Sequence, residues 1–261
     1  MDSCRINAEK MSSPSLKHLS LSYCEFYYGA TRTQLSFPSL VSLELDCCEG
    51  RTPLILESMP SLVSAIVRVG AWCPDRCDKS LCGDCGDNSC EGCYGSSDEG
   101  PHDFFVPSFD HASCLCLKGL LEATHLELSA GPKMYVFRRD LKLLFACNTF
   151  AKLKTLVLGE WCITSDLSAL IWFLQHSPIL EKLTIQIAKE PKCLDAGKQK
   201  TPEQPFALNH LKIVEIQCHG DDILWVCKFL KTLGTYGLPL EKIKIKLTNG
   251  FNFVCTGFGY N

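Results

Sequence analysis

Leucine and other apolar residues recur along the chain in a short phrase with the order L-x-x-L-x-L. In Leu153–Leu158 the leucines alternate with Thr155 and Val157, so one side of a short β-strand is apolar. A strand of this kind cannot cover its own apolar side and needs neighbouring strands stacked beside it. Related phrases supply these neighbours at eight places: Leu16–Leu21, Leu40–Leu45, Leu62–Val67, Ala123–Leu128, Leu153–Leu158, Leu180–Ile185, Leu211–Ile216 and Leu240–Ile245.

The spacing of these phrases predicts one repeat per strand. The first two begin at positions 16 and 40, and the last five begin at positions 123, 153, 180, 211 and 240. These intervals are close to the length of leucine-rich repeats, about 20–29 residues, and the longer ones leave room for a helix. The predicted fold is α/β, a right-handed leucine-rich-repeat solenoid with parallel strands on the concave face and helices or loops on the convex face. The alternative is a compact α/β domain with an open sheet.

Three helices are predicted between the later phrases, where apolar residues recur three or four positions apart. Polar residues that can cap a helix precede two of them, Ser165 or Asp166 in one case and Asp221 with Asp222 in the other. Gly234 is expected to end the last helix. The predicted helices cover residues 138–147, 167–174 and 223–233.

Two stretches without the phrase interrupt the repeats. Residues 73–103 are rich in Cys, Gly, Asp and Ser, which predicts an inserted loop, and residues 189–205 contain three prolines and alternating charges, which predicts a second loop. Because the phrase resumes after each loop, neither separates independent domains. The predicted organisation is N-terminal repeats 12–72, the insertion 73–103, central repeats 104–204, C-terminal repeats 205–250 and a tail 251–261.

Composition and charge exclude several classes of protein. Of the 261 residues, 46% are hydrophobic and 21% are charged, and the net charge of −3 gives no electrostatic case for binding nucleic acid or an anionic membrane. The apolar run Ala169–Leu174 stops far short of the roughly 18 residues that a membrane span requires, and residues 1–10 are too polar for a signal peptide. We expect a monomeric intracellular protein, cytoplasmic or nuclear, that binds neither nucleic acid nor membrane.

The chain has 18 cysteines, and their distribution indicates two roles. Those scattered through the repeats are expected to be small buried apolar residues with free thiols. A denser group lies between Cys73 and Cys93, and four of its members form two C-x-x-C pairs. Two such pairs supply the four thiolates that a tetrahedral zinc site requires. The candidate ligands are Cys82, Cys85, Cys90 and Cys93.

Two other interpretations of this group stay open. Only four residues separate the pairs, whereas zinc ribbons and fingers usually have about 12–20, so a surface loop with reduced thiols is the simpler interpretation. A redox role requires thiolates stabilised by nearby cations, and the acidic residues of the segment oppose it. Apart from zinc at these cysteines, no cofactor is expected.

No catalytic residue is predicted. The chain contains none of the phosphate-binding, nucleophile or zinc-protease motifs that mark common enzymes, and its seven histidines are dispersed. Asp221 and Asp222 are adjacent carboxylates, but at the start of a helix they are more simply caps. We therefore do not expect an enzyme.

The polar positions of the phrases are more informative. If the leucines point inward, the residues between them form the concave face, whose charge changes from acidic to basic along the array. A mixed polar face of this kind suits a folded protein or a peptide. The predicted partner-binding residues are Ser20, Glu44, Asp46, Arg68, His125, Glu127, Thr155, Thr184, Gln186, Glu215, Lys242, Lys244 and Lys246.

The phrases, taken in order, resemble a plant protein family, the F-box/leucine-rich-repeat/FBD-like proteins. The resemblance is strongest where Phe150–Cys162 is followed by Leu174–Leu183. It continues through His210–Ile216 and Lys228–Leu230, which resemble the core of the FBD-type C-terminal segment, so the C-terminal repeats are FBD-like. Ala123–Leu128 and the cysteine-rich insertion also resemble this family, and most of the chain is covered.

The resemblance implies a role in substrate recruitment. Members of the family typically dock on the adaptor of a cullin-based ubiquitin ligase through an N-terminal F-box and hold a target with their repeats. Residues 1–15 are too few and too polar for a three-helix F-box, so docking on the adaptor is not expected. We expect a non-enzymatic protein–protein interaction module with an unidentified protein target. The alternative is a zinc-binding or redox-responsive protein that acts through residues 73–93.

Overall fold

A computed structural model of the chain describes residues 2–26, 32–50, 54–55, 59–71, 73, 75–80, 85, 87, 90, 93, 116–144, 148–163, 167–187, 210–219, 223–235 and 243–248. Within these residues, ten strands form one sheet and three further strands form a second. The predicted loop 189–205, the tail 251–261 and most of the insertion lie outside the described residues. No helix among the described residues has the length and apolar character needed to cross a membrane.

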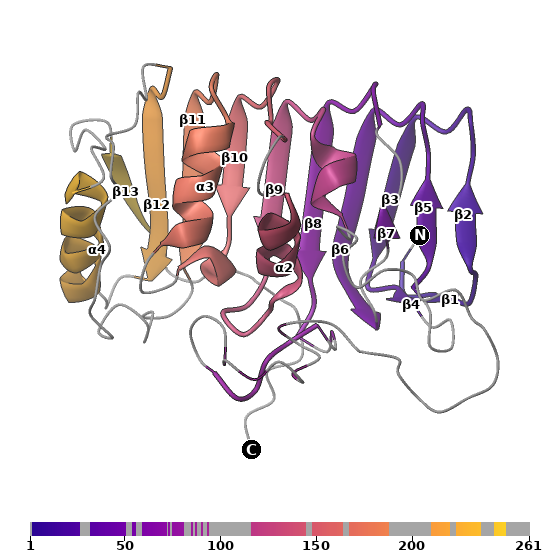
Figure 1. Ribbon diagram of the computed structural model, residues 1–261, viewed down its shortest axis with the longest axis horizontal. Coiled ribbons are helices and arrows are strands. Elements are labelled where there is room, and N and C mark those ends of the chain that lie inside the picture. The colour runs from indigo at the N-terminus through magenta and orange to yellow at the C-terminus, as the bar shows by residue number, and fades with distance from the viewer. Residues whose placement is uncertain are drawn as a thin grey trace.

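The large sheet places its strands in nearly the same order as they occur in the chain (Figure 1), and its strands pair in parallel. Strand β3 (His18–Ser22) lies off this path and pairs with β6. The order is β1 (Arg5–Ile6), β4 (Glu25–Phe26), β6 (Ser42–Gly50), β8 (Ser64–Val69), β9 (His125–Ser129), β10 (Thr155–Leu158), β11 (Lys182–Ile187), β12 (Ile213–His219) and β13 (Ile243–Thr248).

The second half of each of the eight phrases lies on a strand of this sheet, and the strands pair in a common register. On the C-terminal side, Leu156 of β10 lies between Leu126 of β9 and Leu183 of β11. On the N-terminal side, Leu43 of β6 lies between Leu19 of β3 and an alanine of β8, which in turn pairs with Leu126. These side chains belong to one continuous core, in which Leu19 is half-buried and the others are buried. The predicted shared interior of the strands is therefore confirmed.

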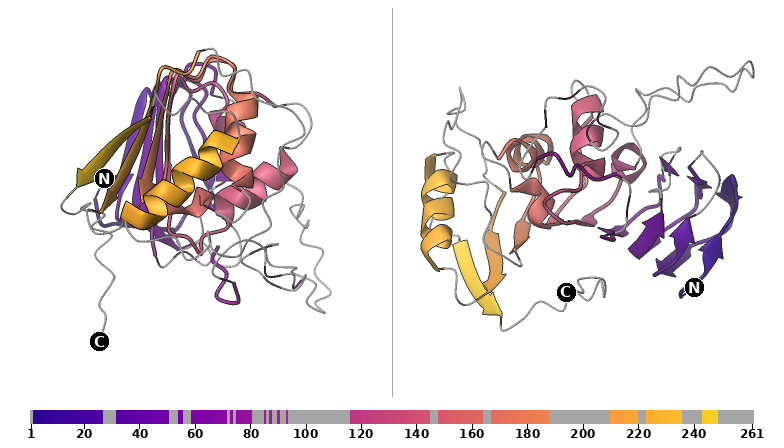
Figure 2. Two further views of the ribbon diagram at one scale, coloured as in Figure 1. Left: turned by 90° about the vertical axis from the view of Figure 1, so that its left-hand side faces the viewer. Right: turned by 90° about the horizontal axis from the view of Figure 1, so that it is seen from below.

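The connections between the strands differ in the two parts of the chain. The N-terminal connections contain short strands, which pair in parallel in the order β2 (Lys10–Ser12), β5 (Gln34–Ser36) and β7 (Leu54–Ile55). The later connections contain helices, which lie on one side of the large sheet (Figure 2). These are η1 (Leu117–Leu120), α2 (Val136–Leu143), η2 (Glu160–Cys162), α3 (Ser168–His176) and α4 (Ile223–Thr235).

The helices differ in part from their predicted bounds. Helix α2 begins two residues early, and α3 begins after Leu167, a buried residue with a φ of 50° and no side-chain cap. Helix α4 continues through Gly234 to Thr235, so the predicted stop is wrong. A glycine costs about 1 kcal/mol inside a helix, which the packing of buried Leu233 can offset. The predicted caps Ser165, Asp166, Asp221 and Asp222 lie outside the described residues.

Aromatic side chains fill the space between the sheet and the helices. The ring of Trp161 lies 4.9 Å from Phe137 and 6.4 Å from Phe173, measured between centroids, and Phe150 lies 5.5 Å from Phe173. The indole nitrogen of Trp161 donates a hydrogen bond of 2.8 Å to the carbonyl of Leu128 on β9. This bond joins the connection after β10 to the preceding strand.

Candidate metal centre and open sheet face

The start of the insertion is fixed against the segment that precedes helix α2. The amide of Cys77 donates to the carbonyl of Lys133 and the amide of Tyr135 donates to the carbonyl of Asp75, both at 2.9 Å. Between these bonds, Arg76 and Met134 form an antiparallel bridge. Cys77 is therefore positioned by backbone contacts with a segment that lies far from it in the chain.

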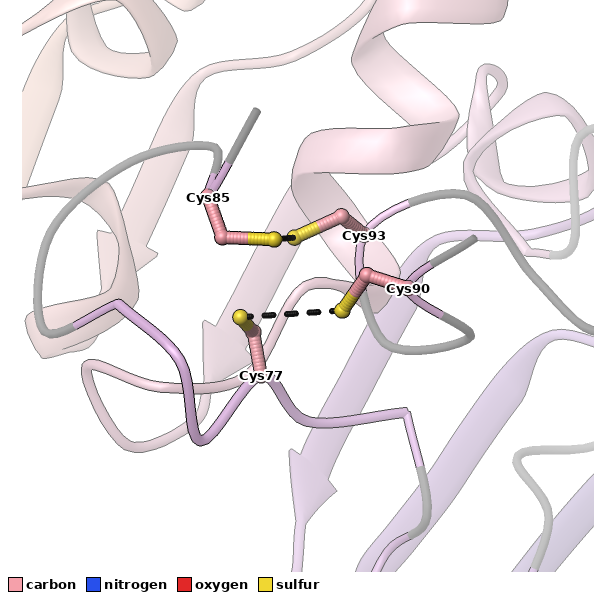
Figure 3. A group of neighbouring side chains, drawn as sticks. All are labelled: Cys77, Cys85, Cys90 and Cys93. Atoms are coloured by element: carbon pink, nitrogen blue, oxygen red, sulfur yellow. Dashed lines mark hydrogen bonds between the residues drawn. The ribbon is translucent and has the colours of Figure 1, made fainter. Parts of the chain in front are cut away.

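Three further cysteines of the insertion converge on Cys77. Cys90 and Cys93 lie in a tight turn, since the amide of Cys93 donates to the carbonyl of Cys90 at 3.1 Å, and the amide of Cys90 donates to the carbonyl of Asp87 at 2.9 Å. Cys85 precedes this turn. Figure 3 shows the four side chains pointing toward a common centre, with Cys85 facing Cys93 and Cys77 facing Cys90. We call these four residues the cysteine cluster.

The sulfur atoms of the cysteine cluster match the dimensions of a tetrahedral thiolate site. All four thiols are free, and the four Sγ atoms lie within 4.8 Å of one another. Two of the distances, Cys77 to Cys90 and Cys85 to Cys93, are 3.7 Å. A tetrahedron with metal–sulfur bonds of about 2.3 Å has sulfur–sulfur edges of roughly 3.8 Å, whereas a disulfide requires about 2.05 Å. The cluster is thus within metal-binding distance.

The surroundings of the cysteine cluster exclude much of the solvent. Tyr135 is buried and packs with Cys77, Cys90 and Cys93 in a small core of its own. Burial raises the pKa of the Cys93 thiol. Burial acts in the same direction on Cys90, but hydrogen bonds with the Cys93 backbone and with neighbouring thiols outweigh it and lower the pKa of Cys90. A cation bound between the four sulfur atoms would favour the thiolate form of the cluster.

The fourth member of the cluster is Cys77, whereas the spacing of the C-x-x-C pairs predicted Cys82. Cys85, Cys90 and Cys93 belong to the cluster as predicted, and Cys82 lies outside the described residues. The sequence pattern did not single out Cys77, because its place in the cluster depends on its pairing with residues 133–135. No local spacing signals that contact.

Four of the other described cysteines, Cys24, Cys116, Cys162 and Cys218, are buried in the repeats, as expected. The thiol of Cys48 donates to the carbonyl of Leu21 at 3.4 Å, and the thiol of Cys24 donates to the carbonyl of Ser22 at 3.5 Å. Burial raises the pKa of Cys48 to about 12, so its thiol stays protonated at neutral pH. Cys47 departs from the expectation because it is disulfide-bonded.

The second candidate site is the face of the large sheet opposite the helices, which we call the open face. The strand pairing aligns its polar residues in rows across the sheet, and these side chains alternate with the buried leucines. The register thus brings together residues that are far apart in the chain. One row contains Glu44, Glu127, Thr184 and Glu215, and the next contains Asp46, Arg68 and Ser129.

A continuous chain of polar contacts crosses the open face. The guanidinium of Arg68 donates to Glu127 at 2.6 Å and to Asp46 at 3.2 Å. The hydroxyl of Ser129 lies 3.4 Å from both Glu127 and Gln186. Strand β10 lies between the strands of Ser129 and Gln186. The residue that follows β10 is Gly159, which has no side chain to separate Ser129 from Gln186. From Gln186 the contacts continue to the next strand at 3.4 Å, through the amide side chain of residue 217.

The two ends of the open face carry opposite charge. Toward the N-terminus, Arg68 is surrounded by three carboxylates, those of Glu44 at 3.9 Å, Asp46 and Glu127. Toward the C-terminus, three lysines of β11 and β13 lie around the carboxylate of Glu215. A hydrogen bond from the residue 217 amide and the nearest lysine lower the pKa of Glu215, against the effect of burial. The lysines are Lys182, Lys244 and Lys246.

The predicted acidic-to-basic gradient is thus present among the described residues of the face. Comparisons of the chain with protein-family models, curated proteins and solved structures find no match. The function is therefore inferred from the chain's own sequence and geometry.

The structure places nearly all the predicted partner-binding residues on the open face. Thr184 is only 3% exposed, so a partner cannot contact it without a rearrangement, and Lys242 lies outside the described residues. The contacts add Ser129, which is buried, together with Gln217 and Lys182 to the predicted set. The alternating pattern assigns all three to this face, since each lies two positions from a predicted residue. The exposed members of the predicted set are Ser20, His125, Lys244 and Lys246, and most of the others are half-buried.

Proposed function

We propose that the chain is a leucine-rich-repeat solenoid that binds a polypeptide partner, and that it resembles the substrate-recognition part of F-box ubiquitin-ligase receptors. Two observations support the solenoid. The strands follow chain order across the sheet, whereas a doubly wound sheet reverses its order at a switch point. The eight phrases also keep one register at intervals close to the length of a leucine-rich repeat.

The polar chain of contacts across the open face carries the binding proposal. Side chains from six strands, β6, β8, β9, β11, β12 and β13, form one surface that no single segment of sequence contains. A surface of this width suits a protein or an extended peptide better than a small molecule, because its polar groups are spread over many strands and do not converge on one point. Opposite charges at its two ends favour a partner whose charges are arranged in the reverse order.

Co-purification with matched variants tests this proposal. The full chain, tagged, is used to recover partners from cells, beside the triple variant Glu44→Ala, Gln186→Ala and Lys244→Ala. We expect the face variant to lose at least about 90% of the partners bound by the unchanged chain. The control variant carries Lys118→Ala and Lys152→Ala, two charges off the open face, and should keep them. Equal recovery by the face variant would remove the binding role of the open face.

A second function, metal binding, is favoured by the geometry of the cysteine cluster. We propose zinc as the ion, because four thiolates in a tetrahedron are its usual structural site, and the sulfur spacing fits that site. Four protein ligands fill the coordination shell and leave no position for a water or a substrate. The proposed site is therefore structural and does not catalyse a reaction.

Metal analysis tests the zinc proposal directly. Protein purified under reducing conditions without chelator should contain about one zinc per chain, and replacing zinc with cobalt should give the intense visible absorption of a tetrahedral thiolate site. Cys77→Ser should remove most of the zinc, whereas the control Cys227→Ser, an exposed cysteine on α4, should leave it in place. A zinc content below about 0.2 per chain in the unchanged protein would contradict the proposal.

A further inference from the structure

The cysteine cluster lies where the two kinds of connection meet. The insertion leaves the sheet after β8, the last strand of the N-terminal part, and the chain returns at β9, the strand before helix α2. Its first described residues pair with residues 133–135, directly before α2 begins. In Figure 1 the described part of the insertion lies beside α2, at one end of the strands.

A buried carboxylate two residues before Cys77 joins the same two parts. Asp75 is only 3% exposed, and it accepts hydrogen bonds from Arg32 at 2.8 Å and from Arg139 at 3.2 Å. Arg32 lies just before β5 in the N-terminal part, whereas Arg139 lies on α2. Because Asp75 is this close to Cys77 in the chain, whatever fixes Cys77 also fixes Asp75 between the two arginines.

Apart from the backbone bonds of residues 75 and 77 and the buried ion pairs of Asp75, the other forces on the described part of the insertion are weak. Its described residues are polar or cysteine, so the apolar surface that they bury comes from the small side chains of the cysteines. Ion pairs such as Arg76 with Asp78 are solvent-exposed, and exposed pairs contribute at most about 1 kcal/mol. Four thiols around one ion form a stronger constraint, because metal binding supplies folding free energy directly.

We infer that the metal ion of the cysteine cluster is a joint, which fixes the insertion on α2 and so holds Asp75 between Arg32 and Arg139. This inference rests on the metal-binding function proposed above. The N-terminal and helical repeats are already linked within the sheet by the pairing of β8 with β9. The metal joint adds a second link between them, on the side of the sheet that bears the connections. Neither arginine is a ligand of the ion, so the ion affects their contacts with Asp75 only through the chain that joins Asp75 to Cys77.

Hydrogen exchange of the full chain tests the joint. We compare the zinc-loaded protein with protein stripped by a chelator under reducing conditions, and follow exchange by mass spectrometry. Loss of zinc should speed exchange at least about tenfold in residues 75–80 and 132–140, where the Cys77 and Tyr135 amides are bonded, and measurably in residues 32–36. Residues 153–158, in the middle of the helical part, should not change.

Two variants test the metal ion and the Asp75 ion pairs separately. Cys85→Ser removes a ligand that has no backbone bond to residues 133–135 among the described contacts, so it should speed exchange there only if the effect passes through the metal. Asp75→Asn leaves all four thiols in place and should keep the zinc content, yet speed exchange in residues 32–36.

The outcomes distinguish the joint from metal binding itself. If the unchanged protein binds about one zinc and stripping leaves exchange in residues 75–80 and 132–140 unaltered, the joint is excluded and the metal-binding function stands. If Asp75→Asn leaves residues 32–36 unaltered, the link to the N-terminal part is excluded. If the unchanged protein binds no zinc, both proposals fall together.

Discussion

The N-terminal and helical parts of the molecule use the same strand phrase but cover it differently. His18 of β3 and Ser42 of β6 are register partners in the N-terminal part, and His125 of β9 and Thr155 of β10 are the equivalent partners in the helical part. The second pair is farther apart in the chain than the first. The shorter repeats return through short strands and the longer ones through helices.

The rise per residue explains this difference. An extended segment advances about 3.3 Å per residue and a helix about 1.5 Å, so a helix needs roughly twice as many residues to run back along a strand. The longer repeats contain the additional residues that such a helix needs. Repeat length therefore determines whether a helix or a short strand forms in the connection, while the phrase itself determines where the strands of the large sheet form. Substitutions in each part can separate the contributions of the two kinds of cover.

Removing one covering side chain from each part tests how strongly the cover stabilises the sheet. Trp161 is fully buried, contacts two aromatic rings and bonds to Leu128, so Trp161→Ala should lower the free energy of unfolding by about 4 kcal/mol. Leu35 of β5 is equally buried but smaller, and Leu35→Ala should cost about 3 kcal/mol. Urea denaturation measures both. A smaller loss for Trp161→Ala than for Leu35→Ala would show that the helical cover is not the stronger one.

Two glycines give a matched pair with a smaller effect. Gly50 at the end of β6 has a φ of 78°, and a Cβ there would lie 2.2 Å from the carbonyl oxygen of Phe26. Gly50→Ala should therefore cost about 3 kcal/mol, since it combines left-handed strain with a backbone clash. Gly131 in the helical part has no neighbour within 4 Å of such an atom, so Gly131→Ala should change stability by less than about 0.5 kcal/mol. Thermal denaturation compares them, and equal losses would contradict the close approach at Gly50.

Acid titration tests the basic end of the open face, where the smallest effect is expected. The pKa of Glu215 is lower in the folded protein than its ordinary value of 4.5, so its ionised form stabilises the fold. This contribution is complete above the ordinary pKa and is lost as the pH falls through the folded pKa. The variant Glu215→Gln should therefore lose less stability on acidification than the unchanged chain, as measured by urea denaturation at a series of pH values. Identical pH profiles would show that the Gln217 amide and the lysines around Glu215 do not stabilise its charge.

The sequence predicted the strands well because each phrase carries its own signal. Leucines at alternating positions indicate which side of a strand is buried, and the second half of each of the eight phrases lies on a strand in one register. The short strands β2 and β5 were not predicted, because Lys10–Ser12 and Gln34–Ser36 are too brief for a period to show. The helices of the later connections were visible both as apolar residues three or four positions apart and as greater repeat length.

The candidate sites could be predicted only in part, for a related reason. Alternation along each phrase identified the open face, but not which side chains meet, because Ser129 contacts Gln186 across a position that Gly159 leaves empty. The cysteine spacing identified three members of the cluster and not Cys77, whose place depends on a backbone pairing with distant residues. Local patterns report local geometry, and these contacts are not local.

The register of β8 and β9 has a practical consequence for protein engineering. Ser64 pairs with His125 in step with every other repeat, although the chain between them is about twice as long as in the later repeats. The array thus accepts a long excursion at this position without shifting any strand. A foreign domain or tag that lengthens the connection between β8 and β9, outside the four thiols, should therefore leave the register of the sheet unchanged.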